Sequence, residues 1–289
     1  MEAANVGLQH IVFPTDGSPE SAKPLPMAVQ LASVHDADVT IVRVVEAPSA
    51  TLTSGAPAVS ADAYAEVVTQ LERQATLDLE EIAARLQASG VRLRTLIRNG
   101  SADAELLAYL AEAKPDLVVM ATHGYGGLAR AALGSVTDRL VREGNAPLLV
   151  MRRSSEPGLQ LRRALVLLDG SPLAEQVIPL AQTLAGRPLQ QLVLFRAVAD
   201  VDERQAAGLY LETVQVWLAD HGTNTEVRVA LGDARLNIER AAHEVDLVML
   251  CTHGRGGWSR LRHGSMAEFV MRGVDRPALL VRAAAPPTG

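Results

Sequence analysis

Short apolar runs recur along the chain, and longer stretches of mixed apolar and polar residues separate them. The runs lie at residues 10–13, 38–45, 91–97, 116–121, 147–152, 164–168, 190–198, 225–230, 246–251 and 277–282. Segments such as IVF, TIVRVV and LVVMA are continuously apolar rather than alternating, which is typical of parallel strands covered by helices on both faces. The pattern therefore predicts ten strands with helices between them.

Helix-start signals agree with this alternation. Ser18 and Ser171 are each followed by proline, a combination typical of a cap and first turn, and a further start is predicted at Asp103. Strands that alternate with helices favour crossover connections and a parallel sheet. The fold class predicted is α/β, with two flavodoxin- or Rossmann-like doubly wound domains, each a five-stranded parallel sheet covered by helices.

The chain contains an internal repeat. IVFPTDGSPESA (11–22) matches ALVLLDGSPLAE (164–175) at an offset of 153 residues. The segment 116–152 matches 246–282 at an offset of 130, and the match retains Thr-His-Gly, Gly-Gly, Gly-Ser and the final arginine. Because both matches occur in the same order, the chain is predicted to consist of two homologous domains.

The repeat places the domains at residues 1–153 and 160–289, joined near RSSEPGLQ. With 48 % hydrophobic and 21 % charged residues, the composition is that of a globular protein. No apolar run reaches the roughly 18 residues of a membrane helix, and the N-terminus lacks the layout of a signal peptide. We therefore expect a cytoplasmic protein with no membrane partner.

The charged residues exclude several classes of binding site. The net charge is −6 and neither half has a basic excess, so nucleic acid is not an expected partner. The only lysines, Lys23 and Lys114, each follow alanine, which excludes a Gly-Lys-Ser/Thr phosphate loop. Cys251 is the single cysteine, and no Cys/His cluster has zinc-ligand spacing, so no metal site is expected.

Two repeated motifs are predicted to lie at the ligand-binding edge, since ligands of open parallel sheets bind beyond the carboxyl ends of the strands. The first is Asp16-Gly17-Ser18, repeated as Asp169-Gly170-Ser171, which places a carboxylate after the first strand of each half. The alternative interpretation is a turn into a helix in which glycine relieves the backbone.

The second motif follows the fourth strand. Ala121-Thr122-His123-Gly124 is followed by nine residues and then by Gly134-Ser135-Val136-Thr137, which opens a helix. Glycine lets the backbone approach a bulky anion, and the N–H groups and dipole of a helix N-terminus favour phosphate. The alternative interpretation is two tight loops that need glycine for their turns.

At this point the sequence resembles the universal stress proteins, whose nucleotide-binding members carry Gly-x-x-Gly, nine residues, and Gly-Ser or Gly-Thr. The resemblance covers nearly the whole chain, once in each half, because Gly124 and Gly134 have the same spacing as Gly254 and Gly264. It implies a flavodoxin-like fold that binds ATP or a related adenine nucleotide, with Mg²⁺. It implies no catalytic residue.

The resemblance assigns roles to individual positions. In the first half the residues that it places around the nucleotide are Pro14, Thr15, Asp16, Val44, Ala121, His123, Gly124, Gly134, Ser135, Val136 and Thr137. The corresponding positions of the second half are Asp169, Ala197, Cys251, Gly254, Gly264 and Ser265. Pro14, Thr15 and Asp16 are expected near adenine and ribose, Val44 beside adenine, and the glycine-serine segment around the phosphates. His123 is either a backbone or phosphate contact or a structural loop residue.

The sequence also departs from the family pattern. The first glycine of the motif is replaced by Ala121 in one half and by Cys251 in the other. The second half further replaces the Pro-Thr pair by Leu167 and Leu168. We therefore rank the second site below the first, and a tandem with one occupied site is a possible outcome.

The last strand of each half is apolar and is predicted to lie at a sheet edge, where an unpaired strand favours association. In the family this edge commonly forms the dimer contact. We expect the two halves to pair with each other through these strands about a pseudo-two-fold axis. Pairing of whole chains into a homodimer remains open, and the effector partner is unknown.

Three functions are compatible with these observations. The leading one is an adenine-nucleotide-binding stress or signalling module, in which the ligand shifts stability or partner choice. A slow ATP hydrolase at the same site is the second, although the sequence shows no lysine loop and no carboxylate pair for activating water. The third is a dimerising scaffold that does not depend on nucleotide.

Overall fold

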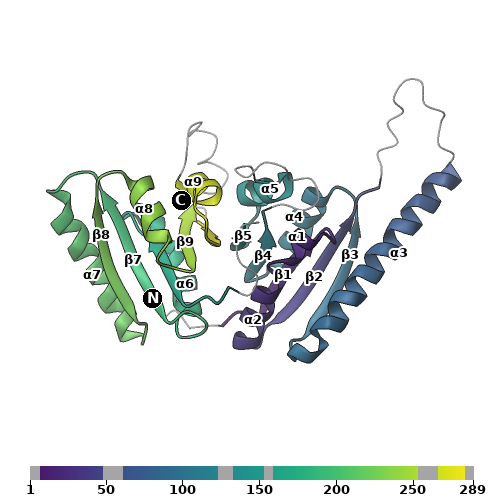
Figure 1. Cartoon of the computed structure of the whole chain (residues 1–289), viewed down its shortest axis with the longest axis horizontal. Coiled ribbons are helices and arrows are strands. Elements are labelled where there is room, and N and C mark those ends of the chain that lie inside the picture. Colours follow the sequence, from purple (N-terminus) through teal and green to yellow (C-terminus); the bar gives the residue numbers. More distant parts are fainter. Residues whose placement is uncertain (1–6, 48–60, 123–132, 153–158, 253–265, 284–289) are drawn as a thin grey trace, which may run out of the picture.

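The computed structural model describes residues 7–47, 61–122, 133–152, 159–252 and 266–283. Strands and helices alternate through the first half (Figure 1), in the order β1 (His10–Thr15), α1 (Pro19–Ala22), α2 (Leu25–His35), β2 (Asp38–Val45), α3 (Ala61–Leu86), η1 (Gln87–Ser89), β3 (Leu93–Asn99), α4 (Ala102–Ala113), β4 (Leu117–Ala121), α5 (Ser135–Glu143) and β5 (Leu148–Met151).

The second half repeats this order. Its elements are β6 (Arg163–Leu167), η2 (Ala174–Val177), α6 (Ile178–Leu184), β7 (Gln191–Val198), α7 (Glu203–Asp220), β8 (Thr225–Leu231), α8 (Ala234–Ala242), β9 (Leu247–Thr252), α9 (Met266–Gly273) and β10 (Ala278–Arg282). All ten predicted strands are therefore present, and the α/β fold class is confirmed.

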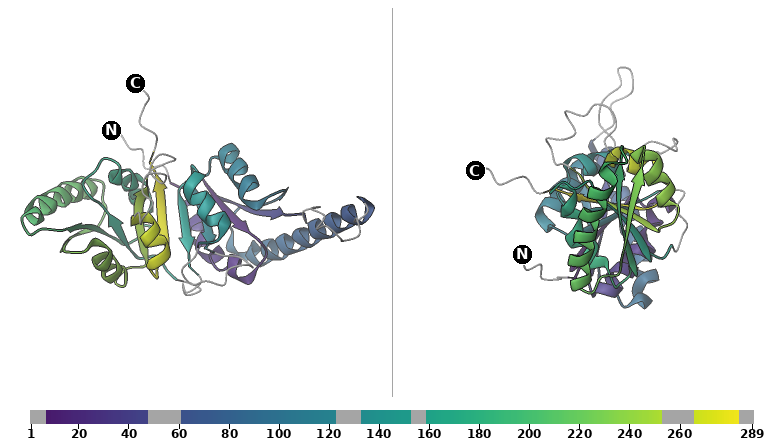
Figure 2. Two further views of the ribbon diagram at one scale, coloured as in Figure 1. Left: turned by 90° about the horizontal axis from the view of Figure 1, so that it is seen from above. Right: turned by 90° about the vertical axis from the view of Figure 1, so that its left-hand side faces the viewer.

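The strands form one continuous sheet in the order β3-β2-β1-β4-β5-β10-β9-β6-β7-β8. Within each half the pairing is parallel, as in β1 with β2 and β6 with β7. The halves join where β5 and β10 pair antiparallel, with Leu279 opposite Leu149. The expected pairing of the two halves through their last strands is thus present, and Figure 2 shows these strands crossing the middle of the molecule.

One apolar core covers each face of the sheet and continues through both halves. On one face α2, α3, α6 and α7 pack on the strands, with Phe13, Leu149 and Leu279 fully buried. On the other face α4, α5, α8 and α9 pack around Val12, Leu165 and Phe195. This two-sided burial explains why the strands read as continuous apolar runs. No helix of the described residues is long and apolar enough to cross a membrane.

The predicted helix starts are correct in one half and wrong in the other. Ser18 caps α1 by accepting a 3.0 Å hydrogen bond from the Ser21 N–H, and α4 begins one residue before Asp103. Ser171 caps only a turn, and the regular helix α6 begins at Ile178. Pro179 lies in the first turn of α6, as Pro26 lies in the first turn of α2, and a proline favours a helix start because it lacks the N–H donor and clashes with the carbonyl four residues earlier.

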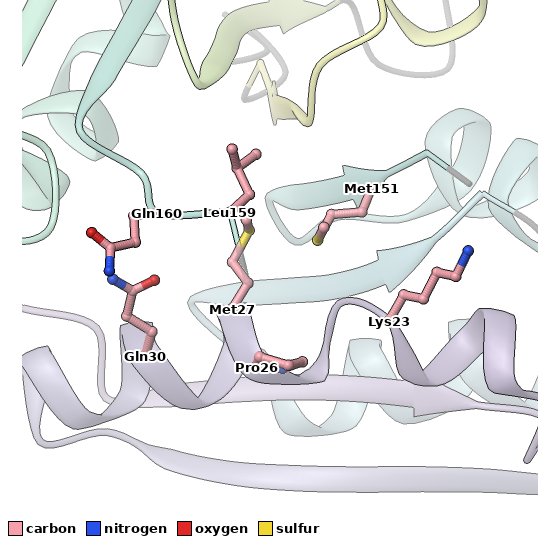
Figure 3. Close-up of a pocket in the computed structure, with 7 residues that line it drawn as sticks. All are labelled: Lys23, Pro26, Met27, Gln30, Met151, Leu159 and Gln160. Atoms are coloured by element: carbon pink, nitrogen blue, oxygen red, sulfur yellow. The ribbon is translucent and has the colours of Figure 1, made fainter. Parts of the chain in front are cut away.

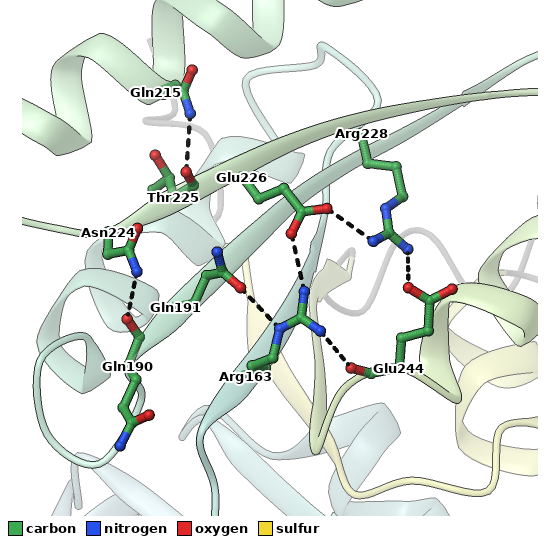
Figure 4. Close-up of polar contacts among 9 residues, drawn as sticks. All are labelled: Arg163, Gln190, Gln191, Gln215, Asn224, Thr225, Glu226, Arg228 and Glu244. Atoms are coloured by element: carbon green, nitrogen blue, oxygen red, sulfur yellow. Dashed lines mark hydrogen bonds and ion pairs between the residues drawn. The ribbon is translucent and has the colours of Figure 1, made fainter.

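A charged network ties together the amino ends of the strands in the second half (Figure 4). Arg163, the first residue of β6, bonds Glu226 of β8 at 3.0 Å, and Arg228 bonds both Glu226 and Glu244 at 2.9 and 2.8 Å. Every charge drawn there has an opposite partner. Because it lies at the edge opposite the carboxyl ends of the strands, the network stabilises the sheet and is no part of the predicted site.

Candidate functional site

The strand order of the first half defines a switch point between β1 and β4. From β1 the chain continues to β2 on one side, and it later returns to β4 on the other side. Ligands of open α/β sheets bind beyond the carboxyl ends of the strands at such a point. Asp16 follows β1 there, and Gly134 and Ser135 begin α5 after β4.

The turn that carries Asp16 is held by local hydrogen bonds. Its Oδ1 accepts a 2.9 Å bond from the Ser18 N–H, and Gly17 adopts the left-handed φ of +78° that favours glycine. Thr15 Oγ1 accepts from the Gly17 N–H at 3.1 Å and contacts Ser21 Oγ at 2.8 Å. These bonds fix the position of the carboxylate at the end of β1.

The start of α5 is fixed to the end of β4. The Gly134 N–H donates to the Thr122 carbonyl at 2.9 Å, and the buried Thr137 hydroxyl lies 3.2 Å from the carbonyls of both Ala121 and Thr122. The Thr137 hydroxyl therefore hydrogen-bonds to the end of β4, and its proton is not free for a ligand. Ser135 is exposed, and the first N–H groups of a helix have no intrahelical acceptor, so they remain available at this edge.

The structure places the other predicted residues of this half as follows. Pro14 is buried in β1 opposite Val42, and Val44 is partly buried near the end of β2. The structure thus brings the described candidates to the carboxyl ends of three adjacent strands, β2, β1 and β4. His123 and Gly124 lie outside the described residues.

Two residues that sequence reasoning missed border the Asp16 turn. A Cβ on Gly17 would lie 2.9 Å from Asp78 Oδ2 and 3.5 Å from Arg43 Cζ, so both side chains touch the turn. Gln74 of α3 donates to Asp78 Oδ1 at 2.8 Å. The repeat carried a signal for Arg43, because it matches Arg196 at the offset of 153 residues.

The second half builds the same turn with fewer bonds. Asp169 Oδ1 accepts from the Ser171 N–H at 2.8 Å, and Ser171 Oγ accepts from the Ala174 N–H at 3.1 Å. The residue before Asp169 is Leu168, which is buried and lacks the hydroxyl that Thr15 offers to Gly17. The turn has the same Asp-to-Ser hydrogen bond as in the first half, but it lacks a bond equivalent to the one from the Gly17 N–H to Thr15 Oγ1.

The surroundings of the second turn are chemically different. A Cβ on Gly170 would lie 2.6 Å from Arg196 Nη1, and the Arg196 guanidinium lies 5.5 Å from the centre of the Tyr210 ring. Tyr210 therefore stands beside this arginine where Asp78 stands in the first half. Burial, followed by the charge of Glu175, raises the pKa of Tyr210, so the phenol stays neutral at physiological pH.

Cys251 and Ala197 are partly buried near the ends of β9 and β7, whereas Gly254, Gly264 and Ser265 lie outside the described residues. Burial raises the pKa of the Cys251 thiol to about 11. This environment is that of an inert thiol, because the thiolate is the reactive form.

We expect Cys251 of the folded protein to react with iodoacetamide at pH 8 about 100-fold more slowly than a free thiol, since its raised pKa leaves little thiolate. Mass spectrometry of timed samples measures this rate. The urea-unfolded chain is the control and should react at the rate of a free thiol. Equal rates in the folded and unfolded protein would contradict the burial of the sulfur.

An ion pair joins α5 to the neighbouring helix α4. Arg139 Nη1 lies 2.6 Å from Asp103 Oδ2. Hydrogen bonds from Ser101 and then Arg139 lower the pKa of Asp103 to about 2. The second half replaces this pair by Arg235, whose guanidinium lies 5.7 Å from the centre of the Phe269 ring.

We expect Asp103→Asn to lower the free energy of unfolding at pH 7 by about 1 kcal/mol, as for a partly exposed ion pair. Because the pKa of Asp103 is depressed when folded, its contribution is complete above about pH 4 and is lost as the pH falls toward 2. Urea denaturation at pH 7 and pH 2.5 measures the difference between variant and wild type, which should shrink at the lower pH. Asp202→Asn makes the same chemical change at a helix start where the side chain forms no capping hydrogen bond, and it serves as the control.

A pocket of about 220 Å³ lies elsewhere, between α2 and the segment that enters the second half (Figure 3). Its lining residues are Lys23, Pro26, Met27, Gln30, Met151, Leu159 and Gln160. None of them is a predicted ligand residue. Among the described residues, no group of three or more His, Cys, Asp or Glu side chains could hold a metal ion.

Comparison with known proteins agrees with the two-domain fold. The model of the universal stress protein family matches residues 7–152 and again residues 160–282. A universal stress protein of Mycolicibacterium smegmatis is 26 % identical over 292 residues, which cover 94 % of this chain and 96 % of that protein. One from Mycobacterium tuberculosis strain H37Rv is 30 % identical over 183 residues, covering 58 % of this chain and 62 % of that protein.

The crystal structure of a universal stress protein from Archaeoglobus fulgidus superposes with a TM-score of 0.75 at 18 % identity, covering 94 % of this chain and 98 % of that one. This likeness concerns the fold. The molecule is a tandem of two doubly wound α/β domains that share one sheet. The chain belongs to the universal stress protein family, with one family domain in each half.

Proposed function

We propose that this protein binds an adenine nucleotide, ATP with Mg²⁺, in its first half, and that binding rather than rapid catalysis is its function in the cytoplasm. One observation carries the proposal: the Asp16 turn and the N-terminus of α5 lie at the switch point of the first five strands. A carboxylate suited to ribose hydroxyls and N–H groups suited to phosphate thus occur at one edge.

Each group has a distinct role in this proposal. Asp16 accepts hydrogen bonds from ribose, while Pro14, Thr15 and Val44 border the base. The N–H groups of the first turn of α5, together with the positive end of its dipole, hold the phosphates without lysine. Mg²⁺ would be bound with the phosphates and would reduce their charge.

Such binding would act through thermodynamic linkage. A ligand that binds only the folded state stabilises it, by about 2.7 kcal/mol when its concentration is 100 times Kd. If two folded conformations differ in affinity, the ligand also shifts the population between them and with it the surface offered to partners. No chemical step is required.

Native mass spectrometry of the freshly purified protein, before and after addition of MgATP, tests the proposal. We expect at least one adenylate mass per chain, and the same spectrum shows whether whole chains pair. No adduct under either condition would overturn nucleotide binding and favour a scaffold role. Phosphate release that Asp16→Asn abolishes while binding is retained would instead show slow hydrolysis.

The second half is proposed as the weaker site or as a structural partner without ligand. Leu168 and Tyr210 support this ranking, because they place an apolar and a neutral side chain at positions occupied by Thr15 and Asp78 in the first half. Cys251 supports it because its side chain is larger than that of Ala121. One nucleotide per chain at saturation would agree with it. Two nucleotides of equal affinity would contradict it.

A further inference from the structure

Two arginines cross between the halves at the ends of their last strands. Arg152 follows β5, and its Nη1 donates to the Val274 carbonyl of the second half at 3.0 Å. Arg282, the last residue of β10, donates from Nη1 to the Gly144 carbonyl and from Nη2 to the Arg142 carbonyl of the first half. We call Arg152 and Arg282 the arginine clamp.

The residues of the arginine clamp occupy equivalent positions in the internal repeat. Arg152 and Arg282 match at the offset of 130 residues, and so do the acceptors Gly144 and Val274. The contact is therefore reciprocal, since each half gives one arginine and receives the other.

The arginines hold the C-terminal ends of the two helices that follow the ligand motifs. Gly144 directly follows α5, and Val274 directly follows α9. The last carbonyls of a helix have no intrahelical donor, and a cation there complements the negative end of the dipole. Arg282 thus satisfies and fixes the far end of α5, the helix whose N-terminus is proposed to hold phosphate.

The main chain of each arginine lies beside the carboxyl end of the fourth strand of its own half, next to the candidate ligand site. Arg282 pairs with Thr252 at the end of β9, and the Ala283 N–H donates to the Thr252 carbonyl at 3.0 Å. In the first half the Thr122 N–H donates to the carbonyl of Met151, the residue before Arg152, at 2.9 Å. Arg282 therefore contacts the end of β9 in the second half through its main chain and the end of α5 in the first half through its side chain.

We propose that Arg282 is a positioning residue for the first-half nucleotide site and that the clamp couples the two halves, an inference that rests on the nucleotide binding proposed above. α5 has nine residues and is about 13 Å long, so it moves as one rigid unit. A phosphate that attracts the N-terminus of α5 therefore also shifts the carbonyls at its C-terminal end, which Arg282 holds. The first site is thus completed from the second half, although Arg282 does not touch the ligand.

Isothermal titration calorimetry of the full chain with MgATP tests this coupling. We expect Arg282→Gln to weaken the first site about five- to tenfold, a typical size for coupling between sites. Arg282→Lys keeps the cation at the helix end and should restore the affinity to within about twofold of wild type. The first site is identified as the binding that Gly134→Val removes.

Arg276→Gln is the matched control. Arg276 also donates to two carbonyls at a helix end, those of Ala242 and His243 at 3.3 and 3.2 Å, but it stays within one half and holds α8. Urea denaturation shows how far each variant is destabilised. A purely structural role predicts that both variants lose stability and neither loses affinity.

The outcomes separate the two proposals. If wild type binds MgATP and Arg282→Gln binds as tightly as Arg276→Gln, the positioning role is wrong and nucleotide binding stands. Failure of Arg282→Lys to recover affinity would also contradict it. If wild type binds no nucleotide, the proposed function fails, and the inference fails with it.

Discussion

Replacing Gly134 by valine is expected to abolish nucleotide binding in the first half while leaving the domain folded. Gly134 has φ −60° and ψ 152°, an extended conformation that valine adopts readily, so the backbone needs no change. The branched side chain would instead stand beside the first N–H groups of α5. We expect the affinity for MgATP to fall by at least about 100-fold, or ~2.7 kcal/mol, in a calorimetric titration.

Gly208→Val is the matched control for this substitution. Gly208 lies in α7, far along the chain from the motifs, and a Cβ there would have no heavy atom within 4 Å. The control should bind MgATP as wild type does. An unchanged affinity in Gly134→Val would mean that the phosphates do not approach this end of α5.

Introducing a charge between the halves is expected to have the largest effect on stability. Leu149 and Leu279 face each other in the antiparallel pair of β5 and β10, and both are fully buried. Leu149→Asp would place a carboxylate there without a partner, at a cost of about 4 kcal/mol or more. Urea denaturation followed by circular dichroism measures the loss.

Leu77→Asp makes the same chemical change on α3, where the side chain is 58 % exposed. The control should stay within about 0.5 kcal/mol of wild type. If Leu149→Asp proved as stable as Leu77→Asp, the pairing of β5 with β10 would not be the contact that joins the halves.

The strands were the most predictable feature, because burial on both faces leaves uninterrupted apolar runs in the sequence. The contact between the halves was also predictable, since the last strand of each is apolar and a bare edge favours pairing. The start of α6 was not predicted, although Pro179 carried the signal. Its counterpart Pro26 lies in the first turn of α2 and marks the same interruption after α1.

Contacts between elements that are distant in the chain could not be predicted from the sequence. The repeat showed that Arg43 matches Arg196 and that Arg152 matches Arg282, but nothing in their spacing indicated which carbonyls or rings they contact. The position of Asp78 beside Gly17 depends on how α3 packs on β2, which side-chain packing decides. For the candidate site, the motifs could be predicted, and the residues that support them required three-dimensional structure.

Joining β5 and β10 within one polypeptide has a genetic consequence. In a dimer of identical chains every substitution appears twice, so neither subunit can change alone. Here the halves have diverged independently around the same framework, with Asp78 beside one turn and Tyr210 beside the other. Selection can therefore alter one domain while preserving its neighbour, and the covalent link keeps the two in equal numbers at any dilution.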